Sequence, residues 1–470
     1  MKSTYSSLAI AILALTPALL HGAATIVIQN DDNAGVGFND PTPVAPVGGN
    51  AGTTLGQQRL NAIQAAANIW GATLNSIIPI IIRVQGAALP CTTHTAVQGS
   101  AEAVAVFRDF AGARPGHWYP AALANKIANV DLDPGNADIR ARFNLNLGQP
   151  NCLTGTFFYL GLDNNHGSNI NLVTLMIHEF AHALGFWTYT SGSTGLQFAG
   201  FPTIYDAFLF DVTANNYWPQ MTDAERIASA VNTRKLVWTG ANVLAAVPQV
   251  LANGTPALSI SAPASVAGSF AIGTASFGPA LTSTGVSGEI MPVVDSPGNI
   301  GLACTPLSTA NGLAVNGKIA LVDRGTCLFE LKVQNCQNAG AVAVIVVEND
   351  PLSPLTGMSG SGPGITIPSV KISLADGNRL KIALATRSRL RSGVLGSMGN
   401  NLSILRGADA LGRPFLYTPN PFLAGSSVVH WDTSAFPNLL MEPIINGDVT
   451  RNVAPPFDIT LALLKDIGWN

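Results

Sequence analysis

The chain has 470 residues, of which 47% are hydrophobic and 11% are charged, with a formal net charge of −3. Globular proteins carry about 25% charged residues, so we expect a neutral, loop-rich surface built with the many Gly and Pro residues. No basic patch points to nucleic acid, and no run of like charges points to an interaction tail. The length predicts two or more domains.

The N-terminal residues have the pattern of an export signal. Lys2 precedes an apolar run at 8–20, and the small residues Gly22, Ala23 and Ala24 follow. This order predicts a secretory signal peptide over residues 1–23, cut near Ala23 or Ala24. The apolar run is too short to span a bilayer. We therefore expect an exported protein, extracellular or periplasmic, without a membrane span.

Five cysteines are consistent with an oxidising compartment. Cys91 and Cys152 both precede the motif at 178–186 that is described below, and they form a natural candidate pair. In the later group of three, we expect a bond between Cys304 and Cys327, which leaves Cys336 outside both disulfides. The sequence alone does not fix this connectivity.

Predicted strands and helices alternate in the first part of the chain. Periodicity and β-branched content predict strands at 25–28, 78–84, 139–145 and 156–160, and helices at 57–74 and 121–127. A strand–helix–strand order followed by a long helix favours an α/β or α+β catalytic domain.

The next predicted helix carries the most specific motif, with the letters HEFAHALGF from His178 to Phe186. On a helix, His178 and His182 stand one turn apart on the same face and can bind one zinc ion. Glu179 lies beside the first ligand, where it can activate a zinc-bound water. The apolar run before it is compatible with a helix capped by Ser168 or Asn169. Gly185 marks the place where the helix must end.

A second domain is predicted after a change to Ala, Ser, Pro and Gly at about 253–269. Strands are expected at 318–322, 341–347 and 367–372, and helices at 329–339 and 375–384. The run GKIALVDRGTCLFELK from Gly317 to Lys332, with Ala339-Gly340-Ala341 and Ile367-Pro368-Ser369-Val370 after it, resembles the protease-associated (PA) domain. That resemblance covers about 255–390 and implies a small α/β module.

Catalytic zinc usually has three protein ligands and one open position, so a third ligand is required. In the pattern HExxHxxGxxH it would fall at residue 188, which is Thr188. The best remaining candidate is His430, in the run SSVVHWD, followed by LMEP around Met441. Asp206 is the alternative, because an Asp downstream of HExxH serves in some zinc peptidases.

The combination of HEFAHALGF, a long insertion, HWD and LMEP resembles the leishmanolysin-like metallopeptidases. The resemblance implies a metzincin-like α/β (α+β) zinc peptidase with an inserted PA-like domain. By this resemblance His178, His182 and His430 bind one catalytic Zn²⁺, Glu179 is the general base, and Met441 forms the Met turn. The expected divisions are 24–254 for the first part of the catalytic domain, 255–390 for the PA-like domain and 391–470 for the second part.

Four further predictions concern the surroundings of the expected site. Asp432 is a candidate for orienting a ligand imidazole, and Tyr205 and Tyr159 are candidate oxyanion donors. The cluster at 163–165, Asp-Asn-Asn, fits either a Ca²⁺ site or, more simply, an Asx turn.

The expected function is a secreted zinc endopeptidase that hydrolyses peptide bonds in proteins or peptides. One alternative is a catalytically degenerate binding protein that acts through the PA-like domain. A weaker alternative is a zinc aminopeptidase carrying a PA domain. Such enzymes use two metal ions and several scattered carboxylates, and HExxH is not their signature.

Overall fold

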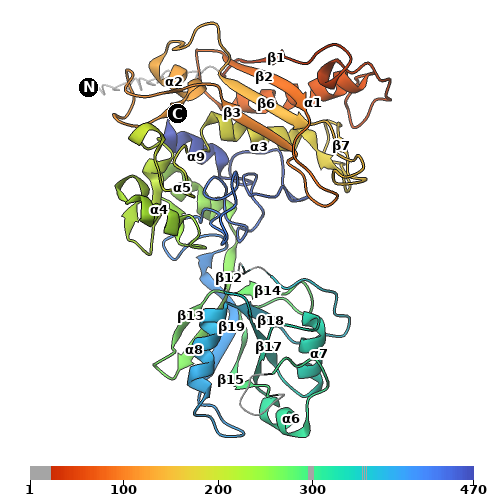
Figure 1. Ribbon diagram of the computed structural model, residues 1–470, viewed down its shortest axis with the longest axis vertical. Coiled ribbons are helices and arrows are strands. Elements are labelled where there is room, and N and C mark those ends of the chain that lie inside the picture. The colour runs from red at the N-terminus through yellow and green to blue at the C-terminus, as the bar shows by residue number, and fades with distance from the viewer. Residues whose placement is uncertain (1–22, 295–300, 352, 354, 356, 470) are drawn as a thin grey trace, which may run out of the picture.

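The computed structural model describes residues 23–294, 301–351, 353, 355 and 357–469. The predicted signal peptide therefore lies outside the described residues, except for Ala23. Figure 1 shows two lobes joined by two long strands, β12 (Asn253–Ala262) and β19 (Leu395–Leu405). The first lobe contains the N-terminal and C-terminal parts of the chain, and the second contains the middle.

A four-stranded sheet in the order β1-β2-β6-β3 supports the first lobe. Three strands are parallel, and the edge strand β3 runs antiparallel to β6. Alternate residues of β2, such as Ile80, Ile82 and Val84, are buried, which is the period of a strand. The bounds are β1 (Ile26–Asn30), β2 (Ile80–Ala87), β3 (Gly99–Ala103) and β6 (Ile139–Asn144).

Two helices pack against each other beside this sheet, α1 (Leu55–Thr73) and α3 (Leu172–Leu184). The Thr54 side chain caps α1 by accepting the Gln57 N–H. The buried Trp70 of α1 donates its indole N–H to the Ile177 carbonyl of α3 at 3.0 Å. Every residue of α3 is buried, so the motif helix is a core element with little freedom to shift.

Both ends of α3 are fixed by specific residues. Asn171 is the N-cap, and its side-chain oxygen accepts the N–H groups of Val173 and Thr174. The caps expected at Ser168 and Asn169 lie too early, because Ile170 and Asn171 still form a short strand. At the other end Gly185 has φ of 129°, and a Cβ there would lie 2.5 Å from Ile467 Cδ1. Glycine therefore permits the close approach of the C-terminal helix α9 (Thr460–Ile467).

The remaining elements of the first lobe are short. A three-stranded sheet has the order β10-β9-β11, and α5 packs on α9. A capping box of Thr222 and Glu225 begins α4. The bounds are β4 (Val106–Phe107), β5 (Tyr119–Pro120), α2 (Ala121–Ala128), β7 (Phe158–Tyr159), β8 (Ile170–Asn171), β9 (Leu209–Asp211), β10 (Asn216–Tyr217), α4 (Asp223–Ser229), β11 (Leu236–Trp238) and α5 (Ala241–Val250).

The second lobe is built on an eight-stranded sheet in the order β13-β12-β19-β15-β16-β17-β18-β14. Its centre, β15 to β18, is parallel, and its flanks are antiparallel. The five residues of β17 are all buried, as expected for a parallel strand covered on both faces. The bounds are β13 (Gly268–Phe270), β14 (Gly273–Thr274), β15 (Val286–Pro292), α6 (Thr309–Val315), β16 (Ile319–Asp323), α7 (Phe329–Asn338), β17 (Ala343–Val347), β18 (Ser369–Ile372) and α8 (Leu374–Leu384).

The α/β class expected from the sequence is confirmed, and the second lobe has its own hydrophobic cores. The disulfides Cys91–Cys152 and Cys304–Cys327 form as predicted, and Cys336 is buried outside both. None of the helices in the described residues is both long and apolar enough to cross a membrane. The exact domain divisions stay a prediction.

Candidate metal centre

Three buried imidazoles meet in the first lobe. His178 and His182 come from α3, and His430 comes from a turn-rich segment near the C-terminus. The three side chains are 5–6% exposed, and one nitrogen of each lies within 4.8 Å of the others. Backbone bonds hold His430 in place, because its carbonyl accepts the Tyr417 N–H at 2.8 Å.

The second ring nitrogen of each imidazole fixes its tautomer. Nδ1 of His178 lies 2.7 Å from the Leu440 carbonyl oxygen, and Nδ1 of His182 lies 3.0 Å from that of Phe186. Nδ1 of His430 lies 2.9 Å from the carbonyl oxygen of Ser426. A carbonyl can only accept, so each Nδ1 carries the proton and each Nε2 presents a lone pair. Three acceptors therefore face one another with no proton between them.

The distances between these acceptors fit one metal ion. His430 Nε2 lies 3.2 Å from His182 Nε2 and 3.3 Å from His178 Nε2. Two nitrogens that each lie about 2.0–2.1 Å from a tetrahedral Zn²⁺ are about 3.3–3.4 Å apart. Backbone carbonyls that bind the outer ring nitrogen are the usual support of a metal-ligating His. The residues present thus suit Zn²⁺.

The electrostatics favour neutral imidazoles. Burial lowers the pKa of His178 to about 4 and that of His430 to about 3, the latter with a contribution from the neighbouring His178. Burial, with the charges of the other two rings, also holds the pKa of His182 well below its usual value. At neutral pH the three rings are therefore in the form that binds metal.

Glu179 is the acidic group beside the cluster. Its side chain lies against the edge strand β3, where a Cβ on Gly99 would meet Glu179 Cγ at 3.2 Å. Burial raises the pKa of Glu179 to about 8, although the Ala101 backbone N–H acts in the opposite direction. A carboxyl whose pKa lies near neutrality is suited to moving a proton.

The cluster opens into a cleft with a volume of about 550 Å³. The walls come from the edge strand β3 and the loop before it, from α3, and from two C-terminal loops. Among the described residues lining the cleft, Glu179 is the one carboxylate. The lining residues are His94, Thr95, Ala96, Val97, Gln98, Gly99, Ser100, Ala101, Leu153, Leu175, His178, Glu179, His182, Trp187, Ala424, Gly425, Ser426, His430, Pro443, Ile444 and Ile445.

Met441 lies in a buried turn whose preceding residue, Leu440, contacts His178. Its carbonyl accepts the Trp431 N–H at 2.8 Å, and its neighbour Leu440 supports His178. The turn is itself anchored by the buried Asp458, whose Oδ2 accepts the Leu440 N–H at 2.6 Å. Nothing in the sequence pattern singled out Asp458 or the three supporting carbonyls, because these contacts depend on the course of the backbone in the folded chain.

Asp432 does not take the orienting role expected of it. Its carboxylate accepts hydrogen bonds from Arg234 Nε at 3.2 Å and from the Ser434 N–H at 2.9 Å. The ligand imidazoles use backbone carbonyls instead, so Asp432 has no imidazole to orient. Asp206, the alternative third ligand, accepts from Thr190 at 2.7 Å and lies outside the cluster.

The expected oxyanion donors and the calcium cluster also have other partners. The hydroxyl of Tyr205 donates to the Val428 carbonyl, and that of Tyr159 donates to Asp163. Neither tyrosine lines the cleft. Asp163 Oδ1 also accepts the Asn165 N–H at 3.1 Å, which is the geometry of the Asx turn that the sequence offered as the alternative to Ca²⁺.

Comparison with known proteins places the PA domain in the second lobe: residues 286–380 match the PA-domain family model. The chain is 35% identical over 99 residues to the probable lipoprotein aminopeptidase LpqL of Mycobacterium tuberculosis, covering 21% of this chain and 19% of that protein. It is 38% identical over 74 residues to the minor extracellular protease Vpr of Bacillus subtilis, covering 16% and 9%. The chain spans less than a third of the length of these relatives.

Among solved structures, the chain is similar to BSAP, a zinc aminopeptidase from Bacillus subtilis, with a TM-score of 0.23 and 24% identity over 31% of this chain and 30% of that one. It is also similar to an aminopeptidase from Aneurinibacillus sp., with a TM-score of 0.24 and 23% identity over 32% and 31%.

These comparisons correct the expected family. A curated relative of the chain is a probable lipoprotein aminopeptidase, and the matching family model is the PA domain, so the assignment to the leishmanolysin-like metzincins was wrong. The PA-like insertion itself is confirmed. The assignment rested on a few ligand residues and a Met turn, and such constellations recur on unrelated folds. They are informative about ligand chemistry and insufficient to identify a family.

Proposed function

We propose that the first lobe is a zinc-dependent peptidase with one catalytic metal ion. His178, His182 and His430 hold the ion, and Glu179 moves the proton. The observation that carries the proposal is the convergence of three imidazole lone pairs, with His430 Nε2 at 3.2–3.3 Å from the other two, beside a buried carboxyl group in an open cleft. Peptidases among the similar proteins support the same reaction class.

When bound, Zn²⁺ supplies a Lewis acid for the scissile carbonyl, lowers the pKa of a water to about 7 and favours the ionised form of Glu179. The protein supplies the proton transfer and the orientation of the ligand imidazoles. Glu179 accepts the proton of the attacking water and then donates it to the leaving amine. The carbonyls of Leu440, Phe186 and Ser426 hold the rings in the tautomer that leaves Nε2 free.

Cleavage within a peptide is favoured by the way the cleft is lined. The edge strand β3 borders it, and an edge strand can pair with an extended peptide through its free backbone groups. Such pairing continues on both sides of a scissile bond. A free α-ammonium would require a carboxylate partner, and the described lining offers only Glu179, which is assigned to proton transfer.

Aminopeptidase activity is the second candidate, and it is supported by the names of the similar proteins. The enzymes of that class that carry PA domains use two metal ions with several carboxylates. Within the described chain, the residues that could hold a metal form a single cluster of three histidines. A binding protein acting through the PA domain alone is disfavoured, because it would have no use for that cluster.

Metal analysis and cleavage assays on three variants test the proposal. Glu179→Ala should keep zinc and lose about 10²–10⁴-fold in kcat, the usual contribution of general acid–base catalysis. His430→Ala should lose both zinc and activity. His166→Ala is the matched control, because His166 lies outside the cluster. Full activity of His430→Ala would overturn the ligand assignment.

The substrate arms separate the two peptidase classes. An internally quenched peptide with an acetylated N-terminus should be cleaved as well as the same peptide with a free N-terminus. Cleavage of the free peptide and of leucine p-nitroanilide, with none of the acetylated peptide, would identify an aminopeptidase instead. Export of the protein is part of the proposal and is supported by its two disulfides.

A further inference from the structure

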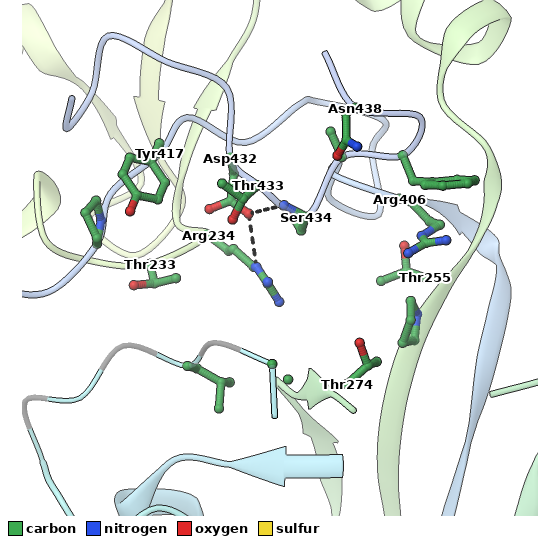
Figure 2. A pocket seen from close by; sticks show the side chains of 17 residues that line it. Thr233, Arg234, Thr255, Thr274, Arg406, Tyr417, Asp432, Thr433, Ser434 and Asn438 are labelled. Carbon is green, nitrogen blue, oxygen red and sulfur yellow. Dashed lines mark hydrogen bonds and ion pairs between the residues drawn. The ribbon is translucent and has the colours of Figure 1, made fainter. Parts of the chain in front are cut away.

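A second cavity lies between the two lobes, with a volume of about 340 Å³. Figure 2 shows its upper wall, formed by the segment that follows His430, and its lower wall, formed by the PA lobe near Thr274. Ligand sites commonly have volumes of about 300–1,000 Å³ and often lie between domains. No residue that lines this cavity also lines the zinc cleft, so it is a separate site.

Arg234 extends into this cavity from the first lobe (Figure 2). Its Nε donates to Asp432 at 3.2 Å, and the Arg234 side chain is 29% exposed. For the part of the chain that the structure describes, this is its one side-chain hydrogen bond. The four N–H groups on its two Nη atoms therefore remain available to a ligand.

Arg406, at the end of β19, lines the same cavity from another side. Its guanidinium stacks on Phe436, with 4.2 Å from Cζ to the ring centroid. Its Nε is buried and has no hydrogen-bond partner among the described residues. Burial lowers the pKa of Arg406, with no carboxylate to oppose that effect. A partly buried guanidinium whose Nε lacks a hydrogen bond and that faces no carboxylate is stabilised when an anion binds.

The charges of the lining indicate which anion fits. Arg234 and Arg406 contribute two positive charges and Asp432 one negative charge, so the lining has a net charge of +1. One carboxylate balances it, whereas a phosphate dianion would leave an excess of negative charge beside Asp432. Thr274 and Ser434 line the same cavity, and the Ser434 hydroxyl is buried without a partner among the described residues.

We propose that this cavity is a binding site for the carboxylate of a peptide, either a C-terminus or an acidic side chain, held by Arg234 and Arg406. Arginine forms bidentate hydrogen bonds with carboxylates, and the peptide part occupies the space between the lobes. A ligand there contacts the first lobe and the PA lobe together and fixes their relative position. The site needs no metal, so its test is independent of the proposed zinc site.

Calorimetric titration of the full chain tests this proposal. The protein carries Glu179→Ala so that nothing is cleaved, and the probe is N-acetyl-Gly-Gly-Gly with a free carboxylate, compared with its C-terminal amide. We expect the carboxylate to bind and the amide to bind at least about tenfold more weakly. Arg234→Met and Arg406→Met should each weaken binding by about 10- to 100-fold, as expected for a hydrogen bond to a charged group.

Two further variants serve as a control outside the cavity and as a block of the cavity itself. Arg391→Met removes an exposed arginine of the PA lobe outside the cavity and should leave the dissociation constant unchanged. Thr274→Asp places a carboxylate in the cavity, so it should abolish binding of the probe and raise the melting temperature. Binding that is equal in the wild type, Arg406→Met and Thr274→Asp would overturn the proposal, because the probe would then occupy another site such as the zinc cleft.

Discussion

The two lobes differ in how the chain builds their polar interiors. In the first lobe, His178 and His430 are separated by 252 residues, and the site forms only when the C-terminal segment packs on α3. In the PA lobe the buried charges are closer in the chain: Glu348 pairs with Lys371 at 3.0 Å and with Arg324 at 2.7 Å. The PA lobe can thus form from one continuous segment, whereas the metal site needs both ends of the chain.

The interiors also differ in charge. The first lobe buries three imidazoles in their neutral form, which suits the binding of a cation. The second lobe buries an ionised Glu348 that is 1% exposed and is balanced by cations. The neutral imidazoles of the first lobe can bind a cation from solution, whereas the charges buried in the second lobe already balance one another. We therefore expect metal to stabilise the first lobe and not the second.

The largest expected effect is on the PA lobe. Glu348→Gln removes the carboxylate that Lys371 and Arg324 face, and breaking a buried ion pair typically costs about 3–5 kcal/mol. Hydrogen exchange should become faster in β16, β17 and β18 and stay unchanged in α3. Equal destabilisation of α3 would contradict the separation of the two lobes.

Gly185→Ala is the corresponding test in the first lobe. The new Cβ would lie 2.5 Å from Ile467 Cδ1, on a residue with φ of 129°. Overpacking and the unfavourable φ together should cost about 2–4 kcal/mol. Chemical denaturation measures the loss, and hydrogen exchange should locate it in α3 and α9. A variant as stable as the wild type would show that the two helices do not pack as described.

Acid should weaken the PA lobe through Glu348. Burial raises the pKa of this carboxyl, but hydrogen bonds from Arg324 and Lys371 outweigh burial and lower it to about 2. The unfolded pKa is about 4.3, so the ionised group stabilises the fold above that pH. As the pH falls from about 4.3 to about 2, up to about 3 kcal/mol should be lost. Urea unfolding should show this slope in the wild type and not in Glu348→Gln; parallel slopes would contradict it.

The smallest of these effects concerns the support of the metal ligands. Asp458→Asn weakens the anchor of the Leu440 N–H, and thereby the carbonyl that orients His178. Loss of such outer contacts typically costs about 10- to 100-fold in metal affinity. Competition with a chelator measures the zinc dissociation constant. A matched control is Asp466→Asn, which alters a carboxylate that caps α5, away from the cluster. Equal affinities in both variants would remove the positioning role.

The sequence predicted those features whose signal lies in one continuous stretch. The PA module was recognised from Gly317 to Lys332 because strand, turn and helix follow one another there, and the match at 286–380 confirms it. The α3 helix was equally clear, apart from its N-cap. His430 could be predicted only as the histidine beside a Met turn, and the structure brings it to the cluster.

Features that depend on tertiary contacts could not be predicted in this way. The sequence of the short edge strand β3 shows no clear alternation of apolar and polar residues, yet this strand borders the cleft. Asp432 was expected to orient a ligand imidazole, but its carboxylate accepts a hydrogen bond from Arg234 instead. The family assignment failed for a related reason, since a handful of ligands says little about the surrounding fold.

Anomalous diffraction at the zinc edge, from crystals of the full chain grown with Zn²⁺, would show whether His178, His182 and His430 hold a single zinc ion. We expect one peak about 2.0–2.1 Å from Nε2 of His178, His182 and His430, and no peak in crystals of His430→Ala. A peak elsewhere, or two peaks about 3.5–4 Å apart as in two-metal sites, would contradict it.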